Sequence, residues 1–149
     1  MNKLNKLNLI DLELKTFTKQ DALDYCQINN INPDNIIELD LSDNELTDIS
    51  GIKVFKNLEK LYLLNNKLKD ILVLKDLIKL QGLYIRWNNI KDISVINSLI
   101  NLKELSITNL ELKSNQIKYF KNLAYLWCKK GFKDMSVINK LNKNINIIK

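Results

Sequence analysis

The feature that constrains this chain most is one spacing of apolar residues that recurs along it. In LEKLYLLNNKLKDI, residues 58–71, leucines fall at intervals of three, two and five, with an asparagine before the last of them. Neither the alternation of a strand nor the period of a helix fits this spacing. The register L-x-x-L-x-L-x-x-N-x-L fits this spacing. It begins at four positions 22 residues apart: Ile36, Leu58, Leu80 and Leu102. Such a period predicts a solenoid, because one unit cannot bury its own leucines and needs its neighbours to close the core.

Each unit divides into two halves with different expected structures. The central L-x-L is expected to be a short strand, in which Leu61 and Leu63 point into the core and Tyr62 points out. On the return half, apolar residues follow at every third position: Ile49, Ile52 and Phe55; Ile71, Leu74 and Leu77; Ile93, Ile96 and Leu99. This spacing predicts short 3₁₀ or irregular turns on the convex side. The turn asparagines are Asn44, Asn66 and Asn88. We expect their amides to bond backbone groups that the turn leaves unpaired, which makes them scaffold residues.

The register is that of the leucine-rich repeat. It predicts an α/β fold: a right-handed solenoid, or horseshoe, with a parallel β-sheet on its concave face. We expect a single domain over residues 1–149, with an N-terminal cap over 1–35, about five repeats over 36–144 and a terminal strand over 145–149. The register weakens in the later repeats, where Leu110 stands in place of the asparagine and Cys128 takes a core position. A buried free cysteine behaves as a small hydrophobe, so we interpret Cys128 as a core residue.

The cap is expected to contain a helix over residues 18–29. Thr18 is the predicted N-cap, with Asp21 three residues later as a variant of the capping box, and Pro33 ends the segment. The residues expected to share its buried face are Ala22, Leu23 and Cys26. An extra strand is expected within Leu7–Leu14.

The stretch IIELDLSDNELTDISGIKVFKNLEKLYLLNN resembles the internalin-type bacterial leucine-rich repeat proteins. Those proteins share a 22-residue repeat with D-I-S or D-L-T after the asparagine, seen here as T-D-I-S at 47–50 and K-D-I-S at 91–94, with a degenerate K-D-M-S at 133–136. Residues 16–35 are similar to the short helical cap of such proteins. The resemblance covers most of the chain and implies protein recognition through the concave sheet.

The composition argues against catalysis and against a metal or cofactor. The chain has no histidine, only three glycines, and no phosphate-binding glycine loop or nucleophile motif. Its two cysteines form no C-x-x-C pair, and two free thiols suit a reducing cytoplasm. We see no secretory signal and no apolar run long enough to cross a bilayer. The expected protein is therefore a non-enzymatic cytoplasmic protein without a membrane partner.

Aromatic residues gather at outward positions of the predicted strands or at their edge. Five of the eleven aromatics do so: Tyr62, Tyr84, Trp87, Tyr125 and Trp127. One interpretation is cross-strand stacking of Tyr62 on Tyr84 that stabilises the sheet. The other is a patch that recognises a protein partner. We favour the patch, because stacking explains only that one pair. The predicted partner-binding residues are Asp40, Tyr62, Tyr84, Arg86, Trp87, Tyr125, Trp127 and Lys129.

Charge is distributed unevenly along the chain. Residues 1–50 carry ten acidic and four basic side chains, net −6, whereas residues 51–149 carry seven acidic and nineteen basic, net +12. This gradient is expected to orient the partner. One alternative is a surface that binds single-stranded nucleic acid through Tyr84, Trp87, Arg86 and Lys129. We do not expect it, because Arg86 is the only arginine. Another alternative is a cytoplasmic inhibitor or immunity-type partner of a toxin or enzyme. The expected oligomeric state is a monomer or a weak homo-oligomer through the C-terminal edge.

Overall fold

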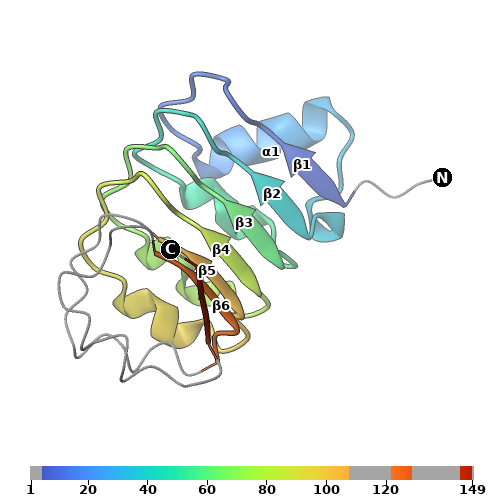
Figure 1. The fold of residues 1–149 in the computed structure, drawn as a ribbon. Coiled ribbons are helices and arrows are strands. Elements are labelled where there is room, and N and C mark those ends of the chain that lie inside the picture. Colours follow the sequence, from blue (N-terminus) through green and yellow to red (C-terminus); the bar gives the residue numbers. More distant parts are fainter. Residues whose placement is uncertain (1–4, 108–121, 129–144, 149) are drawn as a thin grey trace.

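The computed structural model describes residues 5–107, 122–128 and 145–148. Within these ranges the chain forms a seven-stranded sheet in the order β1-β2-β3-β4-β5-β6-β7, with every pair parallel (Figure 1). The strands are β1 Lys6–Asn8, β2 Glu38–Asp40, β3 Lys60–Tyr62, β4 Gly82–Tyr84, β5 Glu104–Ser106, β6 Tyr125–Trp127 and β7 Asn146–Ile148. The helices are α1 Lys19–Ile28 and the 3₁₀ segments η1 Pro33–Asn35, η2 Ser50–Val54, η3 Leu72–Asp76 and η4 Ser94–Ser98. The predicted leucine-rich-repeat solenoid with its parallel sheet is confirmed.

The strands pair in the register that the sequence repeat predicts. Leu39 lies opposite Leu61, and Leu61 lies opposite Leu83, so equivalent residues of successive repeats are neighbours. The middle residue of each strand from β2 to β6 has no measurable exposure: Leu39, Leu61, Leu83, Leu105 and Leu126. One leucine position of the repeat therefore builds a continuous column along the core.

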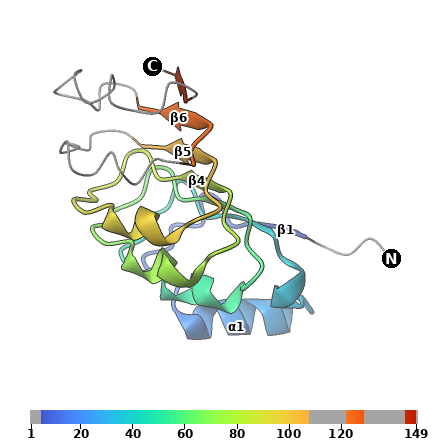
Figure 2. The ribbon, with the colours of Figure 1, turned by 90° about the horizontal axis from the view of Figure 1, so that it is seen from below.

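The return half of each repeat runs behind the sheet in 3₁₀ segments (Figure 2). Each of η2, η3 and η4 contains the middle residue of one predicted apolar triplet, and the other two residues of the triplet cap its ends. All nine of these apolar residues are buried. A 3₁₀ helix has three residues per turn, so a period of three places these side chains in one line against the sheet. The prediction of short 3₁₀ turns is confirmed.

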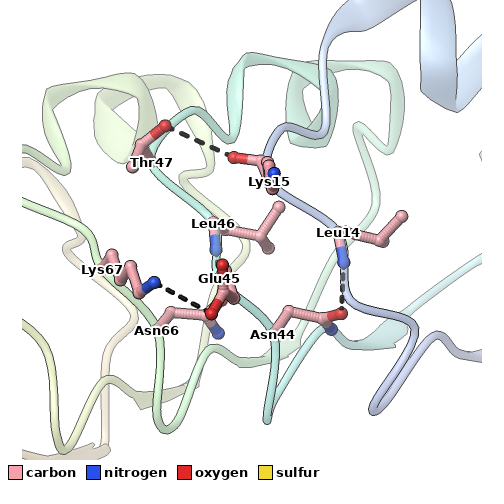
Figure 3. A network of polar contacts seen from close by, with 8 residues as sticks. All are labelled: Leu14, Lys15, Asn44, Glu45, Leu46, Thr47, Asn66 and Lys67. Carbon is pink, nitrogen blue, oxygen red and sulfur yellow. Dashed lines mark hydrogen bonds and ion pairs between the residues drawn. The ribbon is translucent and has the colours of Figure 1, made fainter.

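The turn asparagines join each repeat to the one before it (Figure 3). The side-chain oxygen of Asn66 accepts a hydrogen bond from Leu46 N at 2.9 Å, and its amide donates to Leu41 O at 3.0 Å. Both partners belong to the preceding repeat. Equivalent bonds are made by Asn44 to Leu14 N and Leu9 O, and by Asn88 to Leu68 N and Leu63 O. These bonds satisfy backbone groups that no strand pairs, which confirms that the asparagines are scaffold.

The N-terminal cap contains the predicted helix and the predicted extra strand. Thr18 Oγ1 accepts from Asp21 N, while the Asp21 carboxylate accepts from Thr18 N at 2.7 Å, so the capping box is complete. The carboxylate accepts hydrogen bonds from both Thr18 N and Thr18 Oγ1, and these two bonds hold the pKa of Asp21 below its usual value. The strand expected in Leu7–Leu14 begins one residue earlier and is shorter: β1 covers Lys6–Asn8 and pairs with β2.

One prediction about the cap helix is wrong. Ala22 and Cys26 are buried, but Leu23 is 40% exposed. The helix packs on η2, and the residues that face inward are spaced four apart, which is the narrow contact stripe of a helix. Leu23 lies one position, or about 100°, off that stripe.

Cys128 is buried in the core, as expected. Leu110, Lys129 and residues 133–136 lie outside the described residues. The division into cap, repeats and terminal strand stays a prediction. Within the described ranges, no helix is long and apolar enough to cross a membrane.

Candidate functional site

The candidate site is the open face of the sheet, defined here by the first and third residues of each strand. These residues flank the buried middle residue and point away from the core. Because all strands pair in register, equal positions form straight rows across the sheet. The third-position row is Asn8, Asp40, Tyr62, Tyr84, Ser106, Trp127 and Ile148. The first-position row is Lys6, Glu38, Lys60, Gly82, Glu104, Tyr125 and Asn146.

Four aromatic side chains on the open face are in contact with one another, and we call them the aromatic row: Tyr62, Tyr84, Trp127 and Tyr125. The rings of Tyr62 and Tyr84 stack at a centroid distance of 4.4 Å and an interplanar angle of 4°. Tyr84 meets Trp127 at 6.1 Å, and Trp127 meets Tyr125 at 5.8 Å. The structure thus brings together four of the predicted site residues, from strands β3, β4 and β6.

The contact between Tyr84 and Trp127 passes over a strand that lies between them. Strand β5 separates β4 from β6 and carries Ser106 at the equivalent position. Ser106 is small, so the two larger rings approach each other above it, and it is only 4% exposed. The argument that stacking explains only the pair Tyr62 and Tyr84 is therefore wrong. Ring contacts link all four aromatics, and the stabilising interpretation applies to the whole row.

The row nevertheless leaves surface available to a partner. Tyr125 is 42% exposed, and the other three side chains are half-buried. Aromatic rings in mutual contact are held in place yet still present an edge or a face to solvent. Stabilisation of the sheet and recognition of a partner are therefore compatible uses of the same residues.

Tyr84 is the most firmly held member of the aromatic row. Its hydroxyl donates a hydrogen bond to the Glu104 carboxylate on the next strand. Its ring lies over Gly82, where an added Cβ would be 3.2 Å from ring atom Cε2. Burial, and then the nearby Glu104, raise the pKa of Tyr84 far above its usual value. Tyr84 therefore stays neutral and remains a donor at physiological pH. Burial is also the main reason why the pKa of Tyr62 is raised.

Arg86 and Trp87 lie beyond the end of β4, at the edge of the open face. Trp87 has a left-handed backbone with φ 56°, the conformation of the equivalent residues Asp43, φ 56°, and Asn65, φ 51°. Asp and Asn adopt this conformation routinely, but a bulky side chain there is an outlier. The Arg86 guanidinium carbon lies 4.5 Å from the centroid of the Trp87 ring. Such a distance is typical of a cation–π contact.

The same two residues carry signs of a role outside the scaffold. Trp87 is 53% exposed, and Arg86 has a buried Nε that no hydrogen-bond acceptor reaches. A strained turn that presents an exposed indole is a reason to infer function from structure. Sequence analysis placed both residues in the site but gave no indication of the backbone conformation.

Asp40 lies on the open face beside Tyr62, at the acidic end of the site. Its carboxylate accepts a hydrogen bond from Ser42 N at 3.0 Å, which orients it at the end of β2. Glu38, in the neighbouring row, forms an ion pair with Lys6 at 2.6 Å. This pair was not predictable from the repeat, because Lys6 lies in the cap and outside the 22-residue register. The remaining predicted residue, Lys129, lies outside the described residues.

Three residues that support the aromatic row were not predicted: Gly82, Glu104 and Ser106. The signal for Ser106 and Gly82 is present in the register, since each is small where the neighbouring strands carry larger side chains. In the part of the chain that the structure describes, no group of three or more His, Cys, Asp or Glu residues is arranged to hold a metal ion.

Comparison with known proteins supports this fold at two levels. A family model described as leucine rich repeats, in two copies, matches residues 34–76. The crystal structure of internalin C2 from Listeria monocytogenes strain 4b F2365 superposes with a TM-score of 0.73 at 24% identity, over 97% of this chain and 70% of that chain. The crystal structure of internalin F from the same strain superposes with a TM-score of 0.57 at 24% identity, over 76% of this chain and 40% of that chain. A comparison with curated protein sequences gives no match.

The chain has an internalin-type leucine-rich-repeat fold. Solenoids of this kind present extended concave surfaces.

Proposed function

We propose that this chain is a non-catalytic protein-interaction module that binds a protein partner through the open face of its sheet. The aromatic row forms the centre of the interface, and Arg86 and Trp87 form one edge. One observation carries the proposal: four rings are in continuous contact across β3 to β6 while part of each remains accessible.

The row has the properties of an interface hot spot. Tyrosine and tryptophan supply large contact areas with few rotatable bonds, and they are enriched among residues that dominate binding energy. Here the rings are already restrained, by stacking and by the bond from Tyr84 to Glu104. A partner that binds them therefore loses little side-chain entropy.

Charge at the ends of the site supports a fixed orientation of the partner. Asp40 lies at the β2 side of the row and Asp43 follows it in the next turn. The predicted site also includes Lys129, which follows β6 in the sequence. A partner with complementary charge would be steered into one orientation, with an effect on association rate more than on affinity.

Nucleic-acid binding is less well supported by the same surface. Glu38, Asp40 and Glu104 lie in the two rows that contain the rings, and their carboxylates would repel a phosphate backbone. A role as inhibitor or immunity-type partner of a toxin or enzyme would use the same interface. Identifying the bound partner distinguishes this role from other protein interactions. Two buried cysteine thiols suit a reducing compartment, so we place the function in the cytoplasm.

The test is capture of the partner from source-cell lysate, followed by titration of the purified partner. Tyr84→Ala and Trp127→Ala should each weaken binding at least about tenfold, the loss of an interface anchor. Tyr84→Phe keeps the ring and removes only the hydroxyl, so it should retain most of the affinity. Ile78→Ala is the matched control, because Ile78 is 54% exposed and lies away from the open face, between η3 and β4.

Two results would count against the proposal. Variants of the aromatic row that bind as tightly as wild type would exclude the row as the interface. An affinity that falls steeply with salt, together with nuclease-sensitive capture, would favour nucleic acid instead. Thermal melting of every variant separates loss of binding from loss of fold.

A further inference from the structure

A groove lies between the segment that follows β1 and helix α1, and we call it the cap groove. Its volume is about 580 Å³, within the range of sites that bind small molecules or a few side chains of a partner. Its apolar lining is Leu9, Leu12, Leu14, Phe17, Tyr25 and Ile28. Leu12 and Ile28 are 51% and 82% exposed, whereas the other four are buried or half-buried. Exposed apolar side chains that border a groove are typical of an interaction site.

Leu12 occupies the position that the repeats give to the turn asparagine. The pairings on either side of it, β1 with β2 and Thr16 with Asp48, share one offset, so Leu12 is the equivalent of Asn44. Asn44 is 7% exposed and bonds the backbone, whereas Leu12 is half exposed. The repeat pattern therefore gives no structural reason for a leucine here, and the core gains little from it.

The backbone around Leu12 is restrained. Glu13 has φ 54°, a left-handed conformation that is uncommon for residues other than Gly, Asn and Asp. Asn44 Oδ1 accepts hydrogen bonds from Leu12 N and Leu14 N, both at 3.0 Å, and the second of these is drawn in Figure 3. Leu14 O accepts from Glu45 N at 2.9 Å. The segment is thus fixed to the first repeat on both sides of Glu13, and a restrained apolar side chain loses little entropy on binding.

Helix α1 supplies the other side of the cap groove (Figure 1). The residues that it contributes are Asp21, Asp24, Tyr25 and Ile28. Their spacing of three, one and three places them on one face of the helix. The stripe that packs on η2, Ala22 and Cys26, lies beside this face. The helix therefore has one stripe that serves the fold and a second that lines the groove.

The charged lining of the cap groove is mainly acidic. It consists of the carboxylates of Glu13, Asp21 and Asp24 and the ammonium of Lys15, three negative charges against one positive, net −2. Among the described residues, none of these carboxylates forms an ion pair. Two copies placed groove to groove would bring like charges together, and an anionic lipid surface would be repelled in the same way. The lining complements an apolar ligand that carries positive charge.

We propose that the cap groove binds a basic amphipathic helix of a partner protein. The apolar face of that helix packs between Leu12 and Ile28, and its lysines or arginines lie beside Glu13 and Asp24. Recognition of this kind places an amphipathic helix in an apolar groove and selects it by charge at the rim. No residue of the groove belongs to the two rows of the open face. The inference therefore does not rest on the proposed function.

The experiment uses two defined probes and the full chain. Each probe is a fluorescent peptide of roughly 18 residues, about five helical turns, with leucines on one face. The other face carries lysine in the first probe and glutamate in the second. Fluorescence anisotropy should show that wild type binds the lysine probe at least about tenfold more tightly. The chain as a whole has a net charge of +6, so non-specific attraction would favour the glutamate probe instead.

Variants test the apolar part of the groove. Leu12→Ser and Ile28→Ser should each weaken binding of the lysine probe about tenfold, because each removes a large apolar contact. Ile100→Ser is the matched control, since Ile100 is 63% exposed between η4 and β5. Thermal melting should show that all three variants stay folded, because each changed side chain is at least half exposed.

A second set of variants tests the charges. The double variant Glu13→Gln and Asp24→Asn should weaken binding of the lysine probe and narrow its advantage over the glutamate probe. Asp76→Asn is the control, because it removes a carboxylate that is 60% exposed and lies outside the groove. Nuclear magnetic resonance of the labelled protein should show amide shift changes concentrated in residues 11–17 and 24–28.

Four results would overturn the proposal. The first is equal affinity for the two probes or a preference for the glutamate probe. The second is groove variants that bind the lysine probe as tightly as wild type, or shift changes centred on the open face. The third is a peptide-free dimer that Ile28→Ser dissociates, which would assign the groove to a second copy of the chain. The fourth is binding to phosphatidylserine vesicles that Ile28→Ser abolishes, which would assign it to a membrane surface.

Discussion

At the scale of single residues, the turn asparagines do more than terminate strands. Asn66 is 7% exposed, and its amide bonds reach both its own repeat and the one before it. Each bond satisfies a backbone group that water cannot reach. The cost of losing the side chain is therefore the cost of several buried unpaired groups.

We predict that Asn66→Ala lowers the free energy of unfolding by about 3 kcal/mol, since each unpaired buried group costs about 1–3 kcal/mol. Urea denaturation measures the change. The control is Asn57→Ala, because the Asn57 amide bonds Asp34 O at an exposed site. Its effect should stay below about 1 kcal/mol. Equal losses for the two variants would contradict the scaffold role of Asn66.

Trp87 is the opposite case, because we expect the stability of the fold not to depend on its side chain. We predict that Trp87→Asn leaves the free energy of unfolding within about 1 kcal/mol of wild type. Asparagine occupies the equivalent position in the preceding repeat, and it relieves part of the roughly 1–2 kcal/mol left-handed cost of a bulky residue. The same substitution should weaken partner binding. Thermal melting and titration of the partner measure the two effects, and a large drop in melting temperature would assign Trp87 to the fold.

Residue positions are predictable from sequence where the register fixes them. Alternation placed Tyr62 and Tyr84 outside the core, and the structure agrees. Ring contacts between strands that are not neighbours were not predictable, because they depend on the size of the side chain on the strand between them. Ser106 decides whether Trp127 can reach Tyr84. The left-handed backbone of Trp87 was not predictable either, because a bulky side chain disfavours that conformation and gives no sequence signal for it.

At the scale of elements, the cap and the first repeat meet at a point where side-chain atoms do not fit. Gly51 N donates to Phe17 O at 2.7 Å. A Cβ on Gly51 would lie 2.4 Å from Thr18 O and 2.7 Å from Phe17 O, both backbone atoms. The equivalent residues of the next repeats are Val73 and Val95. The glycine therefore marks the site where the chain leading to α1 crosses η2.

We predict that Gly51→Ala destabilises the protein by about 3 kcal/mol, the upper range for overpacking, because the backbone must move. Gly82→Ala is the comparison, since the atoms its Cβ would meet belong to the movable Tyr84 and Lys60 side chains. It should cost about 1 kcal/mol and weaken partner binding instead. Chemical denaturation of both variants measures the difference. A Gly51→Ala protein as stable as Gly82→Ala would contradict the close packing of the cap.

The elements themselves were largely predictable. Their types follow from periods of two and three in the sequence, and both periods were confirmed. The error at Leu23 has a physical reason: a ten-residue helix that packs on a single 3₁₀ turn buries a stripe too narrow for three neighbouring apolar positions.

At the scale of the whole molecule, the described repeats pack mainly on their immediate neighbours, as expected for a solenoid. The ring contact of Tyr84 with Trp127 across β5 is an exception. Internal strands such as β3 and β4 have a strand on either side, whereas β7 has one. Stability in such a chain is close to a sum of repeat and interface contributions, so the ends open first.

We predict that amide hydrogen exchange is slowest for β3 and β4 and fastest for β7, because opening an internal strand breaks two interfaces. Mass-spectrometric exchange measures the order. Uniform protection along the sheet would show that the chain unfolds as one unit.

The overall architecture was predictable because a single period determines it. The partner was not, because partner choice depends on the outward rows, which the period leaves free to vary. The same independence explains why a fold match at 24% identity identifies a scaffold and leaves the open face to be read from this chain alone.

The in-register pairing has a consequence for how such a chain can change length. Leu39, Leu61 and Leu83 occupy equivalent positions in adjacent strands, so excising residues 58–79 would join one coil to the next without altering any leucine column. Strand β2 would then lie beside β4, with Asp40 against Tyr84. A genetic deletion of one coil would therefore preserve the architecture and change which side chains are neighbours on the open face. A duplication of one coil would lengthen the sheet and change those neighbours in the same way.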